Sequence, residues 1–465
     1  MIEYKTFCCE LNQLFLGCAD FIVRNITLKN ASAAVFSLRE MSDKNYISEK
    51  IIKPLMQYGD YLNFDGNFDA VLRTTGIKTI AFAKDAADAL TKGNVVTVLD
   101  NGTTYIAVCP ADVYFGRSVS EPSSDVTVKG AKSGFVEDIE KNICLLRKII
   151  RSPLLKICEF TKGDITNTRI AIAYIDGRAE KRVIDLVKQK IENIKATVIV
   201  DSGNLEMLMR DCRYGIFPSS GSSEKIDKIA SLLVSGRVAI ICDGSPFVLT
   251  VPYVFAESLQ STEDYIRTPY YATFIRILRF VSLLVAVFLP SLFYLAVERY
   301  PLLLVKGLLD VIIKLRAEIP ISLFWELVIM LAVFEMLREV GLRMPRTVGD
   351  AVGIVGSIII GDAATEAGIA STSVILIVAV CAVSNFVVPV FMNSTVLFRF
   401  LFLFVSYFFG GWGLLAASFA VFLLLCIKRS YYSHYMSPLV PFKPKGMLDF
   451  LIAIPQITLG RKEKP

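Results

Sequence analysis

The chain has 465 residues, 54% of them apolar, with a net charge of +6 and a mean hydropathy of +0.52. This hydropathy excludes an ordinary soluble protein and predicts that part of the chain lies in a membrane. No basic face interleaved with aromatic residues occurs, so nucleic acid is not expected as a partner. The apolar excess lies late, because Arg399 is the only charged residue between Ala367 and Ile427. The first 270 residues read as a soluble region without a signal peptide, which we expect in the cytoplasm.

The soluble region contains the same series of elements twice. A strand at 33–37 leads into a helix at 47–56, and a strand at 170–174 leads into a helix at 183–194. The offsets from each strand to the hairpin that follows are similar in both halves. This order favours an internal duplication over a chance resemblance.

A β-hairpin follows each strand–helix pair, at 93–110 and at 236–252. Each hairpin has two β-rich runs around a turn of Asp, Asn and Gly, residues that tolerate positive φ, and ends at a proline. We therefore predict a cytoplasmic α/β region of two related small subdomains, at about 20–115 and 163–258. Each is expected to be a small mixed sheet with helices.

Residues 118–132 are rich in Ser, Pro, Val and charge, which is typical of a linker. An amphipathic helix follows at 134–150, with Ile139, Ile143 and Leu146 at helical spacing. This helix either packs between the subdomains or offers a surface to a partner. Packing is the commoner role of such a helix.

The remainder predicts an α-helical, multi-spanning membrane domain. Residues 280–297 are uncharged and long enough to cross a bilayer, with Arg276 and Arg279 before them. Residues 302–316 have charges on one face and predict a helix along the interface. Residues 373–392 predict another crossing helix.

Two carboxylates interrupt the apolar run at 319–337. A charge near the bilayer centre costs roughly 2.5–3.5 kcal/mol, so Glu326 is a functional candidate, or else a group that hydrogen-bonds between helices. Glu335 is expected to form an interfacial ion pair with Arg338.

A stripe of small residues, four apart, ends beside two further carboxylates one turn apart, Asp362 and Glu366. Such a stripe lets two helices pack closely in a membrane, or it lines a water-filled path that the carboxylates complete. Its members are Gly349, Gly353, Ser357, Gly361 and Thr365.

Glycines at 410–413 divide the run 395–427 into two short helices around a turn, or a helical hairpin. Residues 428–465 hold seven Lys or Arg against two acids, a difference of +5 that is usual for a cytoplasmic face. With both flanks cytoplasmic, four or six crossings are expected. The outer side then carries basic residues that the positive-inside rule disfavours: Arg299, Lys306, Lys314 and Arg316.

No cofactor or metal is expected, because the ten cysteines lack metal-ligand spacing and His434 is the only histidine. An enzyme is the weakest of the functions considered, since no phosphate-binding loop or dinucleotide fingerprint occurs.

The predicted boundaries are 1–117 for the first subdomain, 118–132 for the linker, 133–258 for the second subdomain with its leading helix, 259–278 for a juxtamembrane segment, 279–430 for the membrane domain and 431–465 for the basic tail.

Taken in order, several motifs resemble the GerA family, the A subunits of bacterial spore germination receptors and their accessory homologues. The motifs are Gly134-Phe135 with Glu137-Asp138 and Asn142-Ile143, Tyr174-Ile-Asp-Gly177, Asp201-Ser-Gly203, Asp243-Gly-Ser-Pro-Phe247, Gln260-Ser-Thr-Glu-Asp-Tyr265, Leu337-Arg-Glu-Val-Gly-Leu-Arg-Met-Pro-Arg346, the glycine-rich 349–368 and Tyr435-Met-Ser-Pro438. The chain departs from the family at Asp350, where Gln is usual, and at Leu38-Arg39-Glu40, where a Tyr-Ile-Asp-Gly type of turn is common.

The resemblance implies a subunit of the spore inner membrane with both termini in the cytoplasm. It implies assembly into a homo-oligomeric ring, a pentamer, around an ion-conducting path. It also implies two companions, a transporter-like B subunit that senses nutrient and a lipoprotein C subunit.

Two functions from different classes follow. The first is a nutrient-gated cation channel, with Val352, Val355 and Ile359 as an apolar gate. Its cation path would be lined by carboxylates, with candidates Asp350, Asp362, Glu366 and Glu326. The second is a secondary transporter component or a scaffold without a pore, which saturable, substrate-specific uptake would distinguish from channel flux.

Overall fold

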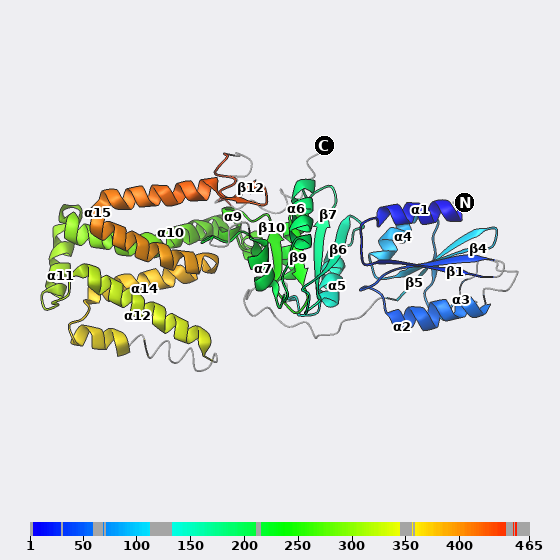
Figure 1. Cartoon of the computed structure of the whole chain (residues 1–465), viewed down its shortest axis with the longest axis horizontal. Helices are drawn as coiled ribbons and strands as arrows, with labels where there is room; N and C mark the ends of the chain where they lie inside the picture. The colour runs from blue at the N-terminus through cyan, green and yellow to red at the C-terminus, as the bar shows by residue number, and fades with distance from the viewer. Residues whose placement is uncertain are drawn as a thin grey trace. The chain divides into compact units, whose positions relative to one another are not determined.

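The chain forms two compact units in a computed structural model (Figure 1). The structure describes residues 3–28, 31–58, 68, 71–111, 133–210, 215–344, 356, 359–442, 450 and 452. The sheet unit consists of Met1–Arg213, Ser219–Tyr253 and Ser430–Tyr432. The helical unit consists of Tyr214–Pro218, Val254–Arg429 and Ser433–Pro465. The predicted linker, 118–132, lies outside the described residues.

The sheet unit contains two five-stranded sheets with the same strand order. The first sheet has the order β1-β2-β4-β5-β3, with β1 Phe21–Thr27, β2 Ser32–Leu38, β3 Lys78–Thr79, β4 Val95–Asp100 and β5 Thr104–Cys109. The second has the order β6-β7-β9-β10-β8, with β6 Leu155–Lys162, β7 Thr168–Ile175, β8 Gly221–Ser223, β9 Val238–Cys242 and β10 Val248–Val251. The equal order confirms the predicted repeat and both hairpins. The expected mixed sheets are wrong, because neighbouring strands pair antiparallel throughout.

Helices cover both faces of each sheet. The first sheet has α1 (Tyr4–Leu14) and α4 (Ala83–Leu90) on one face, and α2 (Lys44–Tyr46), η1 (Ile47–Ile52) and α3 (Lys53–Tyr58) on the other (Figure 1). In β4, Val96 and Val98 pack toward α1 and α4, while Val95 and Leu99 pack toward η1 and α3. Side chains alternate across a strand, so covering both faces explains why these strands are apolar without alternation.

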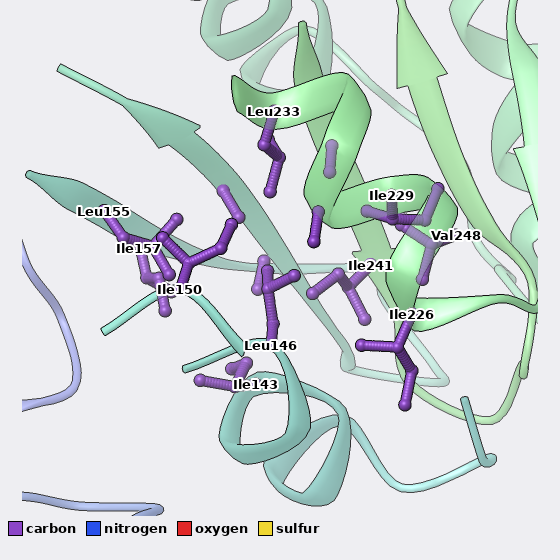
Figure 2. Packing of buried hydrophobic residues seen from close by; sticks show 14 of the residues in the cluster. Ile143, Leu146, Ile150, Leu155, Ile157, Ile226, Ile229, Leu233, Ile241 and Val248 are labelled. Carbon is purple, nitrogen blue, oxygen red and sulfur yellow. The ribbon is translucent and has the colours of Figure 1, made fainter. Parts of the chain in front are cut away.

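The second sheet is covered in the same way, by α6 (Lys181–Glu192) and α7 (Ser202–Met209) on one face and α5 (Ile139–Ile149) and α8 (Ile226–Val234) on the other. Figure 2 shows Ile143 and Leu146 of α5 among Ile157, Ile241 and Ile229 of the sheet and α8. The Asp138 carboxylate caps α5 by accepting from the backbone N–H groups of residues 140 and 141. The packing role predicted for this helix is therefore confirmed.

The two subdomains meet through a buried polar contact. Arg147 of α5 and Asp20 of the first subdomain are both fully buried. Arg147 Nε and Nη2 each donate to a carboxylate oxygen of Asp20 at 2.8 Å. Beside them, Lys156 Nζ donates to the carbonyl oxygen of Leu14 at 2.7 Å. A bidentate pair of this kind fixes both distance and orientation.

The first helices of the helical unit are α9 (Phe255–Leu259) and η3 (Thr262–Tyr265). The unit continues through α10 (Pro269–Tyr294), η4 (Leu295–Arg299), η5 (Pro301–Leu303), α11 (Lys306–Arg316), α12 (Leu323–Arg343), α14 (Thr372–Phe386), η6 (Pro389–Phe391) and α15 (Met392–Ile427). After α15 the chain forms two short strands, β11 (Arg429–Ser430) and β12 (Ser433–His434). Among the described residues, two helices are long and apolar enough to cross a membrane, Pro269–Arg299 and Pro389–Ile427. The crossing helix expected at 373–392 is shorter than predicted, because Pro389 cannot continue α14 and opens η6 instead.

A backbone break divides α15 into two helices. Gly410 has φ 65° and ψ −155°, which ends one helix and starts another. Phe217 stacks on Phe398 near the start of α15, with ring centroids 5.3 Å apart. Lys428, just after the end of α15, donates to the carbonyl oxygens of Phe217 and Pro218. Both ends of α15 thus lie beside Phe217, so the helix doubles back and the predicted helical hairpin is confirmed.

Candidate functional site

Three clusters of charged residues lie along α10 and η4, each built on a buried charged side chain. In the first, Asp264 is buried beside the start of α10 and accepts from Arg279 at 2.6 and 3.0 Å and from Arg276 at 3.2 Å. Ser261 and Asp264 also form a capping box at η3. The two arginines expected to flank the first crossing helix therefore share one carboxylate.

The second cluster is centred on Arg399, which is fully buried. Arg399 Nε donates to the carbonyl oxygen of Ala286 in α10 at 2.7 Å, and Nη1 lies 3.4 Å from Glu335 Oε1 of α12. Glu335 also pairs with Arg338 at 2.9 Å. The predicted Glu335–Arg338 pair is present, but sequence reasoning missed the partners of Arg399, although its isolation among apolar residues was a visible signal.

The third cluster lies at the opposite end of α10 and is built on Glu326, which is fully buried. Glu326 Oε1 accepts from the backbone N–H and the hydroxyl of Ser371 at 2.6 and 2.5 Å. Glu326 Oε2 accepts from Arg316 Nε at 3.2 Å, and Arg316 also pairs with Glu298 at 3.2 Å. Arg316, one of the basic residues that seemed misplaced on the outer side, is thus neutralised by two carboxylates.

The placement of Glu326 near the middle of a crossing helix is wrong. The N-cap residue Ser322 is extended and α12 begins at Leu323, so Glu326 lies in the first turn of α12. There a carboxylate is stabilised by the helix dipole as well as by Arg316. Glu335 lies near the middle of α12 instead, and Arg399 and Arg338 supply its partners.

The spacing of these clusters fits a bilayer. At 1.5 Å per residue, Arg279 and Glu298 are roughly 30 Å apart along α10 and η4, which matches the hydrocarbon core. The first and third clusters therefore lie at opposite ends of this apolar stretch. The Ala286 carbonyl and Arg399 lie between them.

Most of the predicted gate and stripe lies outside the described residues: Gly349, Asp350, Val352, Gly353, Val355 and Ser357. Residues 359–366 are helical, and Asp362 and Glu366 on them are exposed. Ile359 is 60% exposed. A Cβ at Gly361 would meet no atom of the described residues within 4 Å, whereas one at Gly356 would lie 3.2 Å from Leu337 of α12. The gate, path and packing roles of these residues stay predictions.

Within the part of the chain that the structure describes, no group of three or more His, Cys, Asp or Glu side chains could hold a metal ion. The arrangement instead offers buried ion pairs between helices and an exposed acidic helix at 359–366. Such groups position helices and attract cations.

Known proteins match the chain over nearly its whole length. A family model described as Bacillus/Clostridium GerA spore germination protein matches residues 9–464. Spore germination protein KA of Bacillus subtilis (strain 168) is 36% identical over 445 residues, which cover 94% of this chain and 82% of that protein. Spore germination protein A1 of the same organism is 35% identical over 419 residues, covering 90% and 86%. A crystal structure of the N-terminal domain of the A subunit of the Bacillus megaterium spore germinant receptor GerK3 aligns with a TM-score of 0.42 and 22% identity, covering 54% of this chain and 95% of that one.

Proposed function

The chain belongs to the GerA family of spore germination proteins, and we propose that it is a membrane subunit of a germinant receptor. The family match over residues 9–464 carries this proposal. In the proposed role the subunit lies in the spore inner membrane, with a transporter-like B subunit and a lipoprotein C subunit as companions. No enzymatic reaction is assigned to it.

The proposed topology has both flanks in the cytoplasm. It follows α10 from the Asp264 cluster to the Glu298 cluster, and α12 back from Glu326 to Arg343. Ser371 contacts Glu326, so the chain between Arg343 and Ser371 joins opposite ends of the unit. With α14 and the two halves of α15, this path gives six crossings.

We further propose that copies of the subunit assemble into a ring, a pentamer, that conducts cations when nutrient germinants bind the receptor. The segment that joins Arg343 to Ser371 contains the predicted gate and ends in the exposed carboxylates Asp362 and Glu366. Exposed carboxylates repeated around a symmetry axis would attract cations to the path. Their exposure in the single chain supports this arrangement.

The experiment is imaging of the purified full chain in lipid nanodiscs, followed by cation flux from liposomes that contain it. A closed ring, with a resting leak that rises in Val355→Ala and a flux that falls in Asp362→Asn, is the expected result. A stable monomer would overturn the ring and leave the scaffold or transporter role. Saturable, substrate-specific uptake would then favour the transporter role over the scaffold role.

A further inference from the structure

A proline interrupts the hydrogen bonding of α10 inside the helical unit. Pro290 has no backbone N–H, so the carbonyl oxygen four residues earlier, that of Ala286, loses its donor within the helix. Ala286 is fully buried. A buried carbonyl without a donor is costly, most of all where no water can reach it. Something else must therefore supply a hydrogen bond at this point.

Arg399 of α15 supplies that bond. Its Nε donates to the Ala286 oxygen at 2.7 Å, while its Nη1 lies 3.4 Å from the Glu335 carboxylate of α12. We propose that Arg399 is a positioning residue that locks α10 at the Pro290 hinge, by closing the backbone gap in α10 and holding Glu335 of α12 at the same time.

The acceptors around Arg399 are few. Within the described residues, Arg399 Nη2, the Nε and Nη1 atoms of Arg338 and Glu335 Oε2 are buried without a hydrogen-bond partner. The single carboxylate of Glu335 pairs with Arg338 on its own helix and with Arg399 on α15. Because Arg399 is fully buried, loss of Glu335 would leave its charge without a counter-charge, so the Ala286 bond and the Glu335 pair together hold Arg399 in place.

Release of the lock would act on the end of α10. The residues after Pro290 continue into η4, a π-helical turn at Leu295–Arg299 that already departs from regular α-helix geometry. Glu298 in this turn pairs with Arg316, which in turn pairs with Glu326. A bend at Pro290 would thus move Glu298 relative to Arg316 and Glu326 of the third cluster. Arg399 would hold α10 in this way whether or not the assembled chain conducts ions.

Two substitutions separate this role from simple charge neutralisation. Pro290→Ala restores an N–H that can reach the Ala286 oxygen, so it makes the Arg399 bond to α10 redundant. Glu335→Gln removes the carboxylate that Arg399 neutralises, so in this background only the bond from Arg399 to Ala286 is left to be lost. Arg399→Gln is introduced into the native chain, into Pro290→Ala and into Glu335→Gln. For each full-length chain in lipid nanodiscs, with and without Arg399→Gln, the Tm and the rates of backbone amide hydrogen exchange are measured.

We expect Arg399→Gln to lower the Tm by about 5–10 °C in the native background, and by about half as much in Pro290→Ala. Exchange of the α10 amides near Pro290 should accelerate about tenfold, while α14 stays unchanged. Arg343→Gln is the matched control, because Arg343 is 79% exposed in an ion pair on α12 and its loss should shift the Tm by about 1 °C or less.

An equal fall in Tm in the native and Pro290→Ala backgrounds would overturn the proposal, as would full rescue by Glu335→Gln alone. Uniform acceleration of exchange across α10 and α14 would overturn it too. If Arg399→Gln does not accumulate, Arg399→Lys takes its place, because one ammonium can reach only one of the two acceptors. Accumulation of the glutamine variant only together with Pro290→Ala would itself support the lock.

Discussion

The two subdomains of the sheet unit share one strand order but differ sharply in the turn after their second strand. After β7, Asp176 and Gly177 are exposed, and Gly177 has φ 76°. After β2, Glu40 is buried, and Arg39 pairs with Glu159 of the other subdomain at 3.4 Å. The same position in the repeat is thus a free turn in one copy and part of an interface in the other.

The difference explains why the first copy departs from the family's usual turn. A Tyr-Ile-Asp-Gly sequence suits a turn in water, because Gly accepts positive φ and Asp bonds to local backbone. Arg39 instead donates to the carbonyl oxygen of Ala19 at 3.0 Å and contacts Glu159. A duplicated fold can therefore keep its topology while one turn is recruited to join the two copies.

The largest effect should come from breaking the Asp20–Arg147 pair. Arg147→Met leaves the Asp20 carboxylate buried without its cation, so we expect the free energy of unfolding to fall by about 3–5 kcal/mol. Urea denaturation of the full chain in detergent micelles measures it.

Two companion variants sharpen that test. Adding Asp20→Asn to Arg147→Met removes the stranded charge and should recover part of the loss. Lys141→Ala breaks an ion pair with Asp138 whose side chains are 48% and 45% exposed, and should change stability by less than about 0.5 kcal/mol. Equal effects of Arg147→Met and Lys141→Ala would show that the subdomain contact is not a stability determinant.

A smaller effect should depend on pH at Glu40. Burial raises the pKa of this carboxyl from 4.5 to about 8, with a further contribution from nearby Asp20, while Arg39 lowers it. The folded chain therefore keeps a proton that the unfolded chain gives up, so stability falls as pH rises from about 4.5 to about 8. Glu40→Gln should abolish this dependence, so between pH 5 and pH 8 the native chain should lose roughly 3–4 kcal/mol of stability relative to the variant. Parallel stability–pH curves for the variant and the native chain would contradict the raised pKa.

The smallest effect should come from the exposed turn. Gly177→Ala places a Cβ on a residue with φ 76° but meets no atom within 4 Å, so only backbone strain opposes it. We expect a loss of about 1 kcal/mol in urea denaturation. Gly203→Ala, in the first turn of α7 and without positive φ, is the control and should be neutral or stabilising. A loss as large in Gly203→Ala would mean that φ is not the cause.

Sequence reasoning found the strands that are apolar on both faces, such as β2, β4, β7 and β9, and missed those at the edges. The strands β3 and β8 have two and three residues, too few for any periodicity. The strand β6 was hidden because Lys156 and Glu159 interrupt its apolar run, and both serve the contact with the first subdomain. Polar residues in a strand break the apolar pattern, and the partner that accommodates them is not visible in the sequence.

For the charged clusters of the helical unit, too, the sequence shows which residues are unusual but not which partners they contact. The sequence marked Arg399, Glu335 and Glu326 as unusual, because charges are rare in apolar runs. It could not indicate that Glu326 lies in a first turn, since this depends on where α12 begins, or that Ser371, 45 residues later, donates to it. Which charges meet is decided by the packing of helices that are distant in sequence.

The fixed interval between the Asp264 and Glu298 clusters has a consequence for the surrounding lipid. Because the first cluster is tied to α10 through Arg276 and Arg279, and the third to η4 through the Arg316–Glu298 pair, the apolar length between them cannot adjust by letting a single side chain move. A bilayer with longer acyl chains would create hydrophobic mismatch that only tilt or a bend of the helix relieves, and the break available in α10 is at Pro290. In the proposed topology, acyl-chain length would thereby be a mechanical input to this protein, and membranes of different thickness would sort and stress it differently.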